Sequence, residues 1–168
     1  MNKENAEFPM PIGNFSKGFG EITYAGMNDV IKLLNTHVPF TKDSLFLDIG
    51  CGLGQPVYHA AIELGINATG VEIAPLHVEN ALKLKGMLTD GGYFDDYKGV
   101  IEIILGNIEI FESIDCTHIY SYNYVFTKLH TIDIIRIFED VERASALIFN
   151  LCPKSAKKYG LVNAVHVG

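Results

Sequence analysis

Two acids and a glycine-rich turn are the residues of this chain best suited to hold a ligand. Residues 48–55 read DIGCGLGQ, so Asp48 stands before three glycines at every second position, and Glu72 follows eighteen residues after Gly54. Glycine lets a backbone turn sharply and approach a ligand where a side chain would collide. An acid at the end of the following strand can bind the two hydroxyls of a ribose. Together these residues predict a site for an adenosine-containing cofactor.

The spacing of the glycines distinguishes between such cofactors. Dinucleotide sites use G-x-G-x-x-G, whereas this turn reads G-x-G-x-G and follows an acid. A carboxylate at Asp48 would repel a pyrophosphate but could accept a hydrogen bond from an ammonium group. S-adenosyl-L-methionine carries an ammonium group beside a carboxylate that the free N–H groups of a helix start can bind. The pattern therefore favours S-adenosyl-L-methionine, and a nicotinamide oxidoreductase is the least favoured interpretation.

Apolar patterns around the turn predict the elements that position these residues. Residues 45–49 form an apolar run broken only by Asp48, which predicts a buried strand, and Pro56 and Gly65 are typical of a helix start and a helix end. A helix precedes this strand. Further strands are predicted at residues 68–72, 100–105, 118–122 and 146–151, with helices at about 75–88 and 132–143. Alternating strands and helices imply a parallel sheet that binds ligands at its carboxyl edge.

Other polar and aromatic residues fall on the same predicted edge. Asn107 follows the third strand, where its side chain could bond the amino group of adenine. Residues 122–126 read YNYVF, and their aromatic side chains could form a narrow apolar channel with Asn123 as the polar acceptor. Aromatic faces attract a nearby sulfonium or amine. Tyr120 and Tyr122 are expected in the core, and residues 90–96 in an exposed loop.

Composition bounds the class of protein. At 168 residues the chain has room for one domain with a full core. No apolar stretch is long enough to span a membrane and no signal peptide is evident, so we expect an intracellular protein, nuclear or cytoplasmic. Thirteen basic residues against twenty acidic ones disfavour autonomous nucleic-acid binding. Three cysteines and six histidines lack metal-ligand spacing, so no metal is expected.

Five stretches spread over residues 17–126 resemble class I S-adenosylmethionine-dependent methyltransferases, and among them the catalytic domain of the disruptor-of-telomeric-silencing type of histone lysine methyltransferase. FGEIT at 19–23 is similar to the segment that folds over the cofactor in that family and that generic class I enzymes lack. DIGCGLGQ resembles its cofactor loop, and GVE at 70–72 its ribose-binding acid. Gly106 and Asn107 stand where the family has Gly-Asp, and YNYVF stands where it has Asn-Asn-Phe-Ala-Phe.

This resemblance implies a Rossmann-like α/β fold, with residues 1–24 as an N-terminal arm and cofactor lid and residues 25–168 as the methyltransferase domain. It implies methyl transfer to a protein lysine, histone or non-histone, so that a protein substrate is the expected partner. The candidate catalytic residues are Asn123, Tyr124 and Phe126. The candidate cofactor-binding residues are Phe19, Glu21, Thr23, Asp48, Gly50, Cys51, Gly52, Gln55, Glu72, Ile73, Asn107 and Ile108.

Departures from the family pattern keep alternatives open. Ile73 replaces a lysine, Asn107 an aspartate and Tyr122 the first asparagine of the pair, and strongly basic segments are absent. Few residues follow the fifth strand, so the sheet lacks its last strand unless residues 161–167 supply one. A non-catalytic S-adenosylmethionine-binding regulatory or assembly subunit is therefore the main alternative. An adenine or glutamine methyltransferase ranks below it, because both prolines of their Asn-Pro-Pro-Phe motif are missing.

Overall fold

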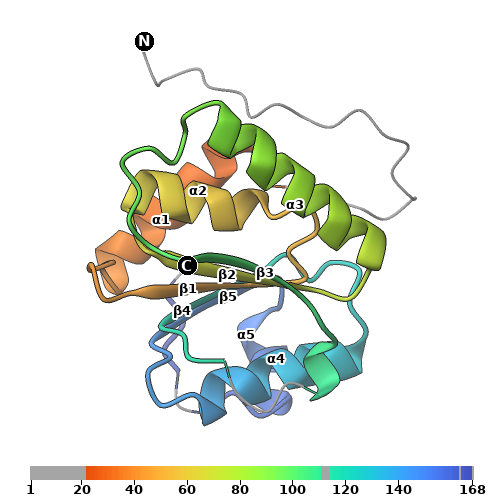
Figure 1. Cartoon of the computed structure of the whole chain (residues 1–168). Helices are drawn as coiled ribbons and strands as arrows, with labels where there is room; N and C mark the ends of the chain where they lie inside the picture. Colours follow the sequence, from red (N-terminus) through yellow and green to blue (C-terminus); the bar gives the residue numbers. More distant parts are fainter. Residues whose placement is uncertain (1–21, 111–113, 163, 168) are drawn as a thin grey trace.

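A computed structural model describes residues 22–110, 114–162 and 164–167 of the chain (Figure 1). The helices are α1 (Tyr24–His37), α2 (Gln55–Leu64), α3 (Pro75–Asp90), α4 (Lys128–Asp140) and α5 (Pro153–Lys158), with a short 3₁₀ helix, η2 (Ile108–Ile110). The strands are β1 (Leu45–Ile49), β2 (Asn67–Glu72), β3 (Ile101–Leu105), β4 (His118–Ser121) and β5 (Ala146–Phe149).

The five strands form one parallel sheet in the order β3-β2-β1-β4-β5. The chain runs from β1 to one edge through β2 and β3, and then returns to the other side of β1 for β4 and β5. The connections at the carboxyl ends of β1 and β4 therefore lead in opposite directions, which is where open α/β sheets bind ligands. The register places Asp48 of β1 between Gly70 of β2 and Tyr120 of β4.

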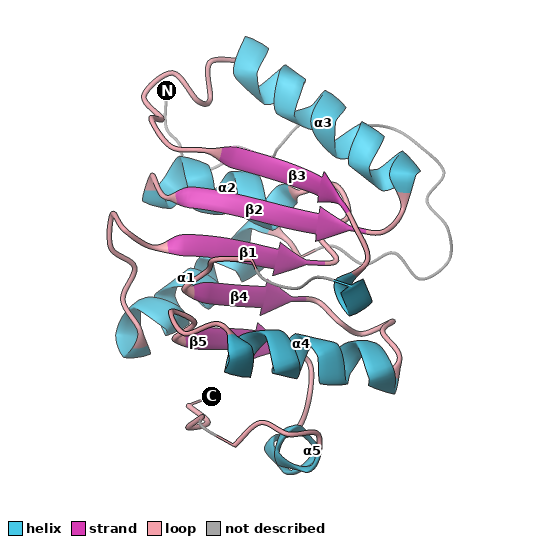
Figure 2. Cartoon of the chain, turned by 60° about the horizontal axis from the view of Figure 1, so that its bottom comes forward, coloured by secondary structure: helices cyan, strands magenta, loops and turns pink. Residues whose placement is uncertain are grey.

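Helices cover both faces of the sheet. Figure 1 shows α1, α2 and α3 on one face, and Figure 2 shows α4 lying across the other with α5 beside it. Successive residues of β1 point to opposite faces, so Phe46 packs in a core cluster with Met27 of α1 and Tyr58 of α2, while Leu47 packs in a second cluster with Ile134 of α4. The Rossmann-like α/β fold with a preceding helix is confirmed.

Local signals set the ends of α2. Gly54 is its N-cap with a φ of +80°, Pro56 lies in the first turn, and Gly65 ends the helix with a φ of +68°. The Tyr58 hydroxyl donates to the Ala81 carbonyl at 2.7 Å, which fixes α2 against α3. The start and end predicted for this helix from Pro56 and Gly65 are confirmed to within one residue.

The predicted position of α4 is wrong by about one turn. The helix begins at Lys128, four residues earlier than expected, and ends at Asp140. Thr127 and His130 form a capping box: the Thr127 hydroxyl accepts from the His130 N–H, and the His130 side chain accepts from the Thr127 N–H. This box satisfies N–H groups at the helix start. A histidine in its third position lies outside the Ser/Thr-x-x-Glu/Gln pattern by which a capping box is predicted from sequence.

Smaller differences concern strand ends and the chain after β5. β3 begins one residue later than predicted, β4 ends one residue earlier and β5 ends two residues earlier. No strand forms in the described part of residues 161–167, so within the described chain the sheet ends at β5. The loop at 90–96 is exposed at most positions, but Phe94 packs against the core. Within the described residues, no helix is both long and apolar enough to cross a membrane.

Candidate functional site

A cavity of about 670 Å³ opens at the carboxyl ends of β1, β2, β3 and β4. It lies at the point where the connections of the sheet diverge, as the topology requires. The loops after the four strands and the first turns of α2, α3 and α4 line it. The predicted residues among those lining it are Asp48, Gly50, Cys51, Gly52, Glu72, Ile73, Asn107, Ile108, Tyr124 and Phe126.

The glycine turn forms the floor of this cavity. The N–H groups of Gly50 and Cys51 both donate to the Val71 carbonyl, at 2.8 and 3.0 Å, so the turn is fixed to the end of β2. Gly50 has a φ of +78°, and a Cβ there would lie 2.5 Å from Cζ of Phe126. Only glycine fits this backbone without strain. The Cys51 thiol is not a nucleophile, because burial, assisted by the charge of Asp48, raises its pKa.

Asp48 is a buried acid without a full set of partners. Its side chain is 2% exposed, and Oδ2 has no hydrogen-bond partner among the described residues. Burial raises the pKa of Asp48 well above its usual range, and the negative charge of Glu72 raises it further. Asp48 also lines the cavity. A ligand that brings an ammonium group to this oxygen would satisfy it, which fits the expected cofactor.

Glu72 is held in place by the backbone around it. The Gly52 N–H donates to Oε2 and the Ala74 N–H donates to Oε1, each at 2.9 Å. The His77 ring adds a third contact, with Nδ1 3.5 Å from Oε1. Charged hydrogen bonds of this kind fix a carboxylate in one orientation. The carboxylate lies at the end of β2 in the cavity wall, where its remaining lone pairs could accept the two hydroxyls of a ribose.

Two apolar side chains and an amide also line the cavity. Ile108 of η2 is 9% exposed, whereas Ile73 is 62% exposed after β2. Asn107 precedes η2, and its side chain bonds Glu109 in two places. Apolar faces with a polar edge are typical of a site for a nucleobase.

Aromatic residues after β4 form the rim of the cavity. Tyr122 is 45% exposed and Tyr124 is 77% exposed, so the prediction that Tyr122 belongs to the core is wrong. Tyr120 is buried as expected but also lines the cavity. Phe126 is half-buried over Gly50. The side chain of Tyr122 leaves the core because β4 ends one residue earlier than predicted.

Asn123 does not line the cavity with its neighbours. It is 5% exposed, and its Oδ1 accepts from the Asn150 N–H at 2.6 Å, so its oxygen is used to join the end of β4 to the end of β5.

Of the four remaining predicted residues, two are described and are not among the lining residues, and two are not described. Phe19 and Glu21 lie outside the described residues. Thr23 is the N-cap of α1, where its hydroxyl accepts from the Gly26 N–H at 3.1 Å. Gln55 is the first residue of α2 and is half-buried.

The lining residues that the sequence analysis did not name as site residues include Ile22, His77, Tyr120 and His130. His77 falls in the first turn of a helix whose start at Pro75 was predicted, so its nearness to Glu72 could have been expected. His130 could have been found only by recognising the capping box at Thr127. Among the described residues, no group of three or more His, Cys, Asp or Glu side chains is placed to hold a metal ion.

Comparison with protein families finds a match to the family described as "Histone methylation protein DOT1" over residues 13–157. A search of curated proteins by sequence finds no match.

Solved structures with the same fold include a mycolic acid cyclopropane synthase, CmaA1, complexed with SAH and CTAB (TM-score 0.57, 16% identity, 82% of this chain and 48% of that chain). They also include the cyclopropane synthase MmaA2 from Mycobacterium tuberculosis (TM-score 0.56, 18% identity, 86% and 50%). A third is a TehB-like SAM-dependent methyltransferase from Corynebacterium glutamicum (TM-score 0.53, 14% identity, 77% and 68%). The chain spans about half the length of the cyclopropane synthases that it matches.

Proposed function

The chain belongs to the DOT1 family of S-adenosyl-L-methionine-dependent methyltransferases, and from that premise we propose that it transfers a methyl group to a lysine side chain of a protein, histone or non-histone. The cofactor is S-adenosyl-L-methionine. The observation that carries the proposal is the aromatic rim, Tyr122, Tyr124 and Phe126, at the mouth of a cavity whose floor holds a buried acid with an unpartnered oxygen.

When bound, the cofactor supplies a methyl group on a positively charged sulfur. In the proposal, Asp48 accepts the ammonium group at the amino-acid end, and Glu72 accepts the hydroxyls of the ribose. Ile73 and Ile108 pack against the nucleobase beside Asn107. The burial and bonding of these side chains and the order of the residues along the sheet edge support these proposed roles.

The residues on the rim prepare the acceptor. A lysine amine can accept a methyl group only when it is uncharged. An amine placed among aromatic rings loses contact with water, which disfavours its charged form and lowers its pKa. Aromatic faces also attract the positively charged sulfur of the cofactor. Phe126 packs over Gly50 and Tyr124 stands exposed at the edge, so the first would shield the amine and the second would meet the incoming protein.

Residues 1–24 are proposed to act as the arm that closes over the cofactor, with Phe19, Glu21 and Thr23 as contacts. Gln55, after the glycine turn, is proposed as a further cofactor-binding residue. The described part of this proposal includes Ile22, which lines the cavity, and Thr23, which caps the start of α1. We propose no autonomous contact with nucleic acid, because the chain carries a net charge of −7. A lysine of a nuclear or cytoplasmic protein is the proposed acceptor.

A non-catalytic cofactor-binding subunit is the second candidate. The observation that favours it is the commitment of the Asn123 oxygen to the Asn150 N–H, which takes from the cavity the amide expected to align the reacting groups. In this case the cavity would bind S-adenosyl-L-methionine, and the aromatic rim would bind a partner protein without transfer.

Labelled methyl transfer distinguishes the two candidates. The chain is incubated with S-adenosyl-L-methionine carrying a tritiated methyl group and with nucleosomes, core histones or a protein extract, and methylated residues are located by mass spectrometry. Label on lysine Nε supports the proposal. Binding of S-adenosylhomocysteine without transfer to any acceptor supports the regulatory subunit, and label on another residue type refutes lysine specificity.

A matched pair of variants tests the rim. Tyr124→Ala removes an exposed ring at the cavity, and Leu82→Ala removes an exposed apolar side chain on α3 that does not line it. We expect Tyr124→Ala to lower methyl transfer by about tenfold at unchanged S-adenosylhomocysteine affinity. Leu82→Ala should change neither.

A further inference from the structure

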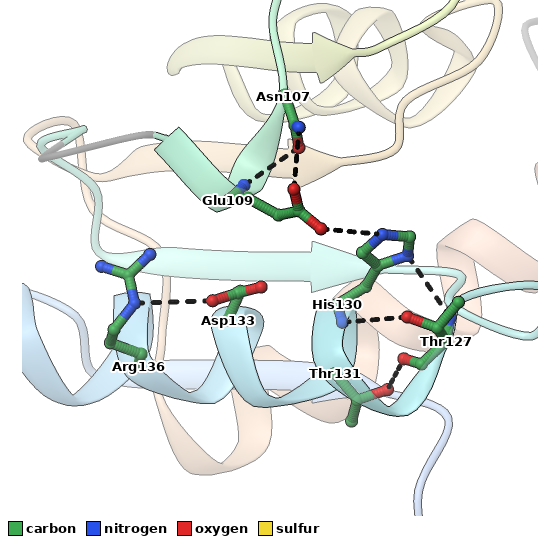
Figure 3. A network of polar contacts seen from close by, with 7 residues as sticks. All are labelled: Asn107, Glu109, Thr127, His130, Thr131, Asp133 and Arg136. Atoms are coloured by element: carbon green, nitrogen blue, oxygen red, sulfur yellow. Dashed lines mark hydrogen bonds and ion pairs between the residues drawn. The ribbon is translucent and has the colours of Figure 1, made fainter.

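A chain of polar contacts crosses the wall of the cavity between the end of β3 and the start of α4 (Figure 3). Asn107 Nδ2 donates to Glu109 Oε2 at 3.1 Å, and the Glu109 N–H donates to Asn107 Oδ1 at 3.0 Å. The other oxygen of that carboxylate, Oε1, lies 3.5 Å from Nε2 of His130. Nδ1 of the same ring accepts from the Thr127 N–H at 3.3 Å. Asn107 and His130 line the cavity.

These contacts fix the orientation of the Asn107 amide. An amide has an accepting oxygen and a donating nitrogen of nearly the same shape, so it can turn over unless its partners forbid it. A backbone N–H can only donate and a carboxylate can only accept. If the Asn107 amide turned over, its nitrogen would meet the Glu109 N–H and its oxygen would meet the Glu109 carboxylate. Both hydrogen bonds would be lost and like groups would face each other.

His130 in turn holds the carboxylate. Since Nδ1 accepts from the Thr127 N–H, the proton of the neutral ring lies on Nε2 and points to Glu109. The edge of the ring also packs against Phe126, with the ring centroids 5.6 Å apart. Both ring nitrogens are thus engaged, so His130 does not serve as a base for the acceptor amine. It acts as a clamp between α4 and Glu109.

We propose that Glu109 and His130 are positioning residues that hold the Asn107 amide in one orientation, and that the site thereby selects a nucleobase with an amino group over one with a carbonyl group. The inference rests on the proposed binding of the nucleobase beside Asn107. Adenine offers an N–H donor where hypoxanthine offers a carbonyl acceptor. An amide free to turn over would bind both bases, whereas a fixed amide oxygen accepts from the first and repels the second.

This role explains why an amide can stand in this position. An aspartate presents an acceptor in either orientation and needs no orienting partner. An asparagine presents an acceptor only when its nitrogen is held elsewhere, and Glu109 supplies that partner from two residues further along the chain. Glu109 does not itself line the cavity, so it acts through Asn107.

The test is the ratio of two dissociation constants measured by titration calorimetry on the full chain, for S-adenosylhomocysteine and for S-inosylhomocysteine. The unsubstituted chain should prefer the adenine ligand by about 100-fold. Glu109→Gln should lower this preference about tenfold, because a side-chain amide at 109 can either donate or accept, so that only the backbone N–H of residue 109 still opposes the turned-over Asn107. His130→Phe should lower it less, since Glu109 keeps its bond to Asn107.

The double variant Asn107→Asp/Glu109→Gln provides a rescue. The aspartate accepts in either orientation and the glutamine can donate to it, so the preference for adenine should return. A loss of folding cannot produce this result, because both ligands are compared on the same variant. Asp133→Asn is the matched control: Asp133 lies on α4 and pairs with Arg136 at 3.7 Å, without contact to Asn107 (Figure 3), and its ratio should not change.

An unchanged ratio in Glu109→Gln overturns the inference, as does a double variant that prefers the hypoxanthine ligand. These outcomes differ from failure of the proposed cofactor site. If the unsubstituted chain binds neither ligand, the cofactor assignment itself fails. If it binds both equally, the cavity binds the nucleoside but Asn107 does not read its base.

Discussion

Replacing Asp48 by asparagine should stabilise the ligand-free chain while weakening cofactor binding. Asp48 is buried at the end of β1, and its Oδ2 has no partner among the described residues. A buried polar atom without a partner costs about 1–3 kcal/mol, and more when it is charged. The asparagine has nearly the same shape, and although one atom of its amide also stays without a partner, it buries no charge. We therefore expect Asp48→Asn to raise the free energy of unfolding at neutral pH by about 1–3 kcal/mol.

The pH dependence of stability follows from the raised pKa of Asp48. The pKa of Asp48 is raised in the folded chain by burial, with a smaller contribution from the charge of Glu72. In the unfolded chain the pKa is about 4. Between these two values the folded state binds the proton more tightly, so stability decreases as pH rises through this window. Asp48→Asn removes the contribution, and the unfolding free energy of the variant should fall less steeply as pH rises above about 4.

Cofactor binding should be weakened by the same replacement that stabilises the ligand-free chain. An ammonium group beside Asp48 favours the ionised carboxylate, so binding at a pH below the raised pKa should release a proton. Calorimetry in buffers of different ionisation enthalpy measures that release directly. In Asp48→Asn the release should disappear and the affinity for S-adenosylhomocysteine should fall by about 10- to 100-fold, the worth of a charged hydrogen bond.

Denaturant unfolding from pH 4 to 8 and calorimetry of the same two proteins provide the measurements. Glu79→Gln is the control for the loss of one acidic charge, because Glu79 is exposed on α3 and pairs with Lys83 on the surface. A variant less stable than the parent at neutral pH would refute the claim that Asp48 is a buried and incompletely paired acid. Unchanged affinity would refute its contact with the ammonium group.

Three further outcomes follow from contacts in the same cavity. Glu72→Ala should weaken S-adenosylhomocysteine binding about 100-fold or more in titration calorimetry, because up to two charged hydrogen bonds to the ribose are lost; a smaller change than tenfold would contradict the ribose assignment. Gly50→Ala should lower the free energy of unfolding by about 2 kcal/mol or more in denaturant titrations, since its φ is +78° and its Cβ would meet Phe126; a stability equal to the parent would contradict this. Asn123→Ala should leave the Asn150 N–H unpaired, which costs about 1–3 kcal/mol of stability and lowers the thermal midpoint. Asn123→Asp keeps an accepting oxygen and should lower the midpoint less. Equal losses in the two variants would show that the hydrogen bond is not the cause.

The parts of the site nearest in sequence could be predicted well. Asp48, the glycine turn and the start of α2 lie within one short stretch, and each residue type there answers a local requirement: an apolar strand, positive φ angles and a first-turn proline. Glu72 was predicted because a crossover of that length returns the chain to the neighbouring strand with its acid at the same edge.

The arrangement of the aromatic segment was predicted less well. The sequence predicts that residues 122–126 lie at the end of β4. Which of these side chains face the cavity depends on the residue at which β4 ends. Pairing of β4 with β1 stops at Tyr120, and its pairing with β5 stops at Ser121. The alternation of side chains between the two faces of a strand ends with the strand; beyond it Tyr122 is exposed and Asn123 turns toward the end of β5.

The amino-acid sequence by itself determined the fold, the cofactor loop and the acid that follows it, because these depend on residue types and spacings that act over a few residues or over one strand-helix-strand unit. Only the tertiary structure decided that Glu109 and His130 hold Asn107 and that the Asn123 oxygen binds the Asn150 N–H. Such pairs come from segments separated by up to 27 residues. Their contact depends on the packing of α4 against η2 and on the exact length of β4, which no local pattern specifies.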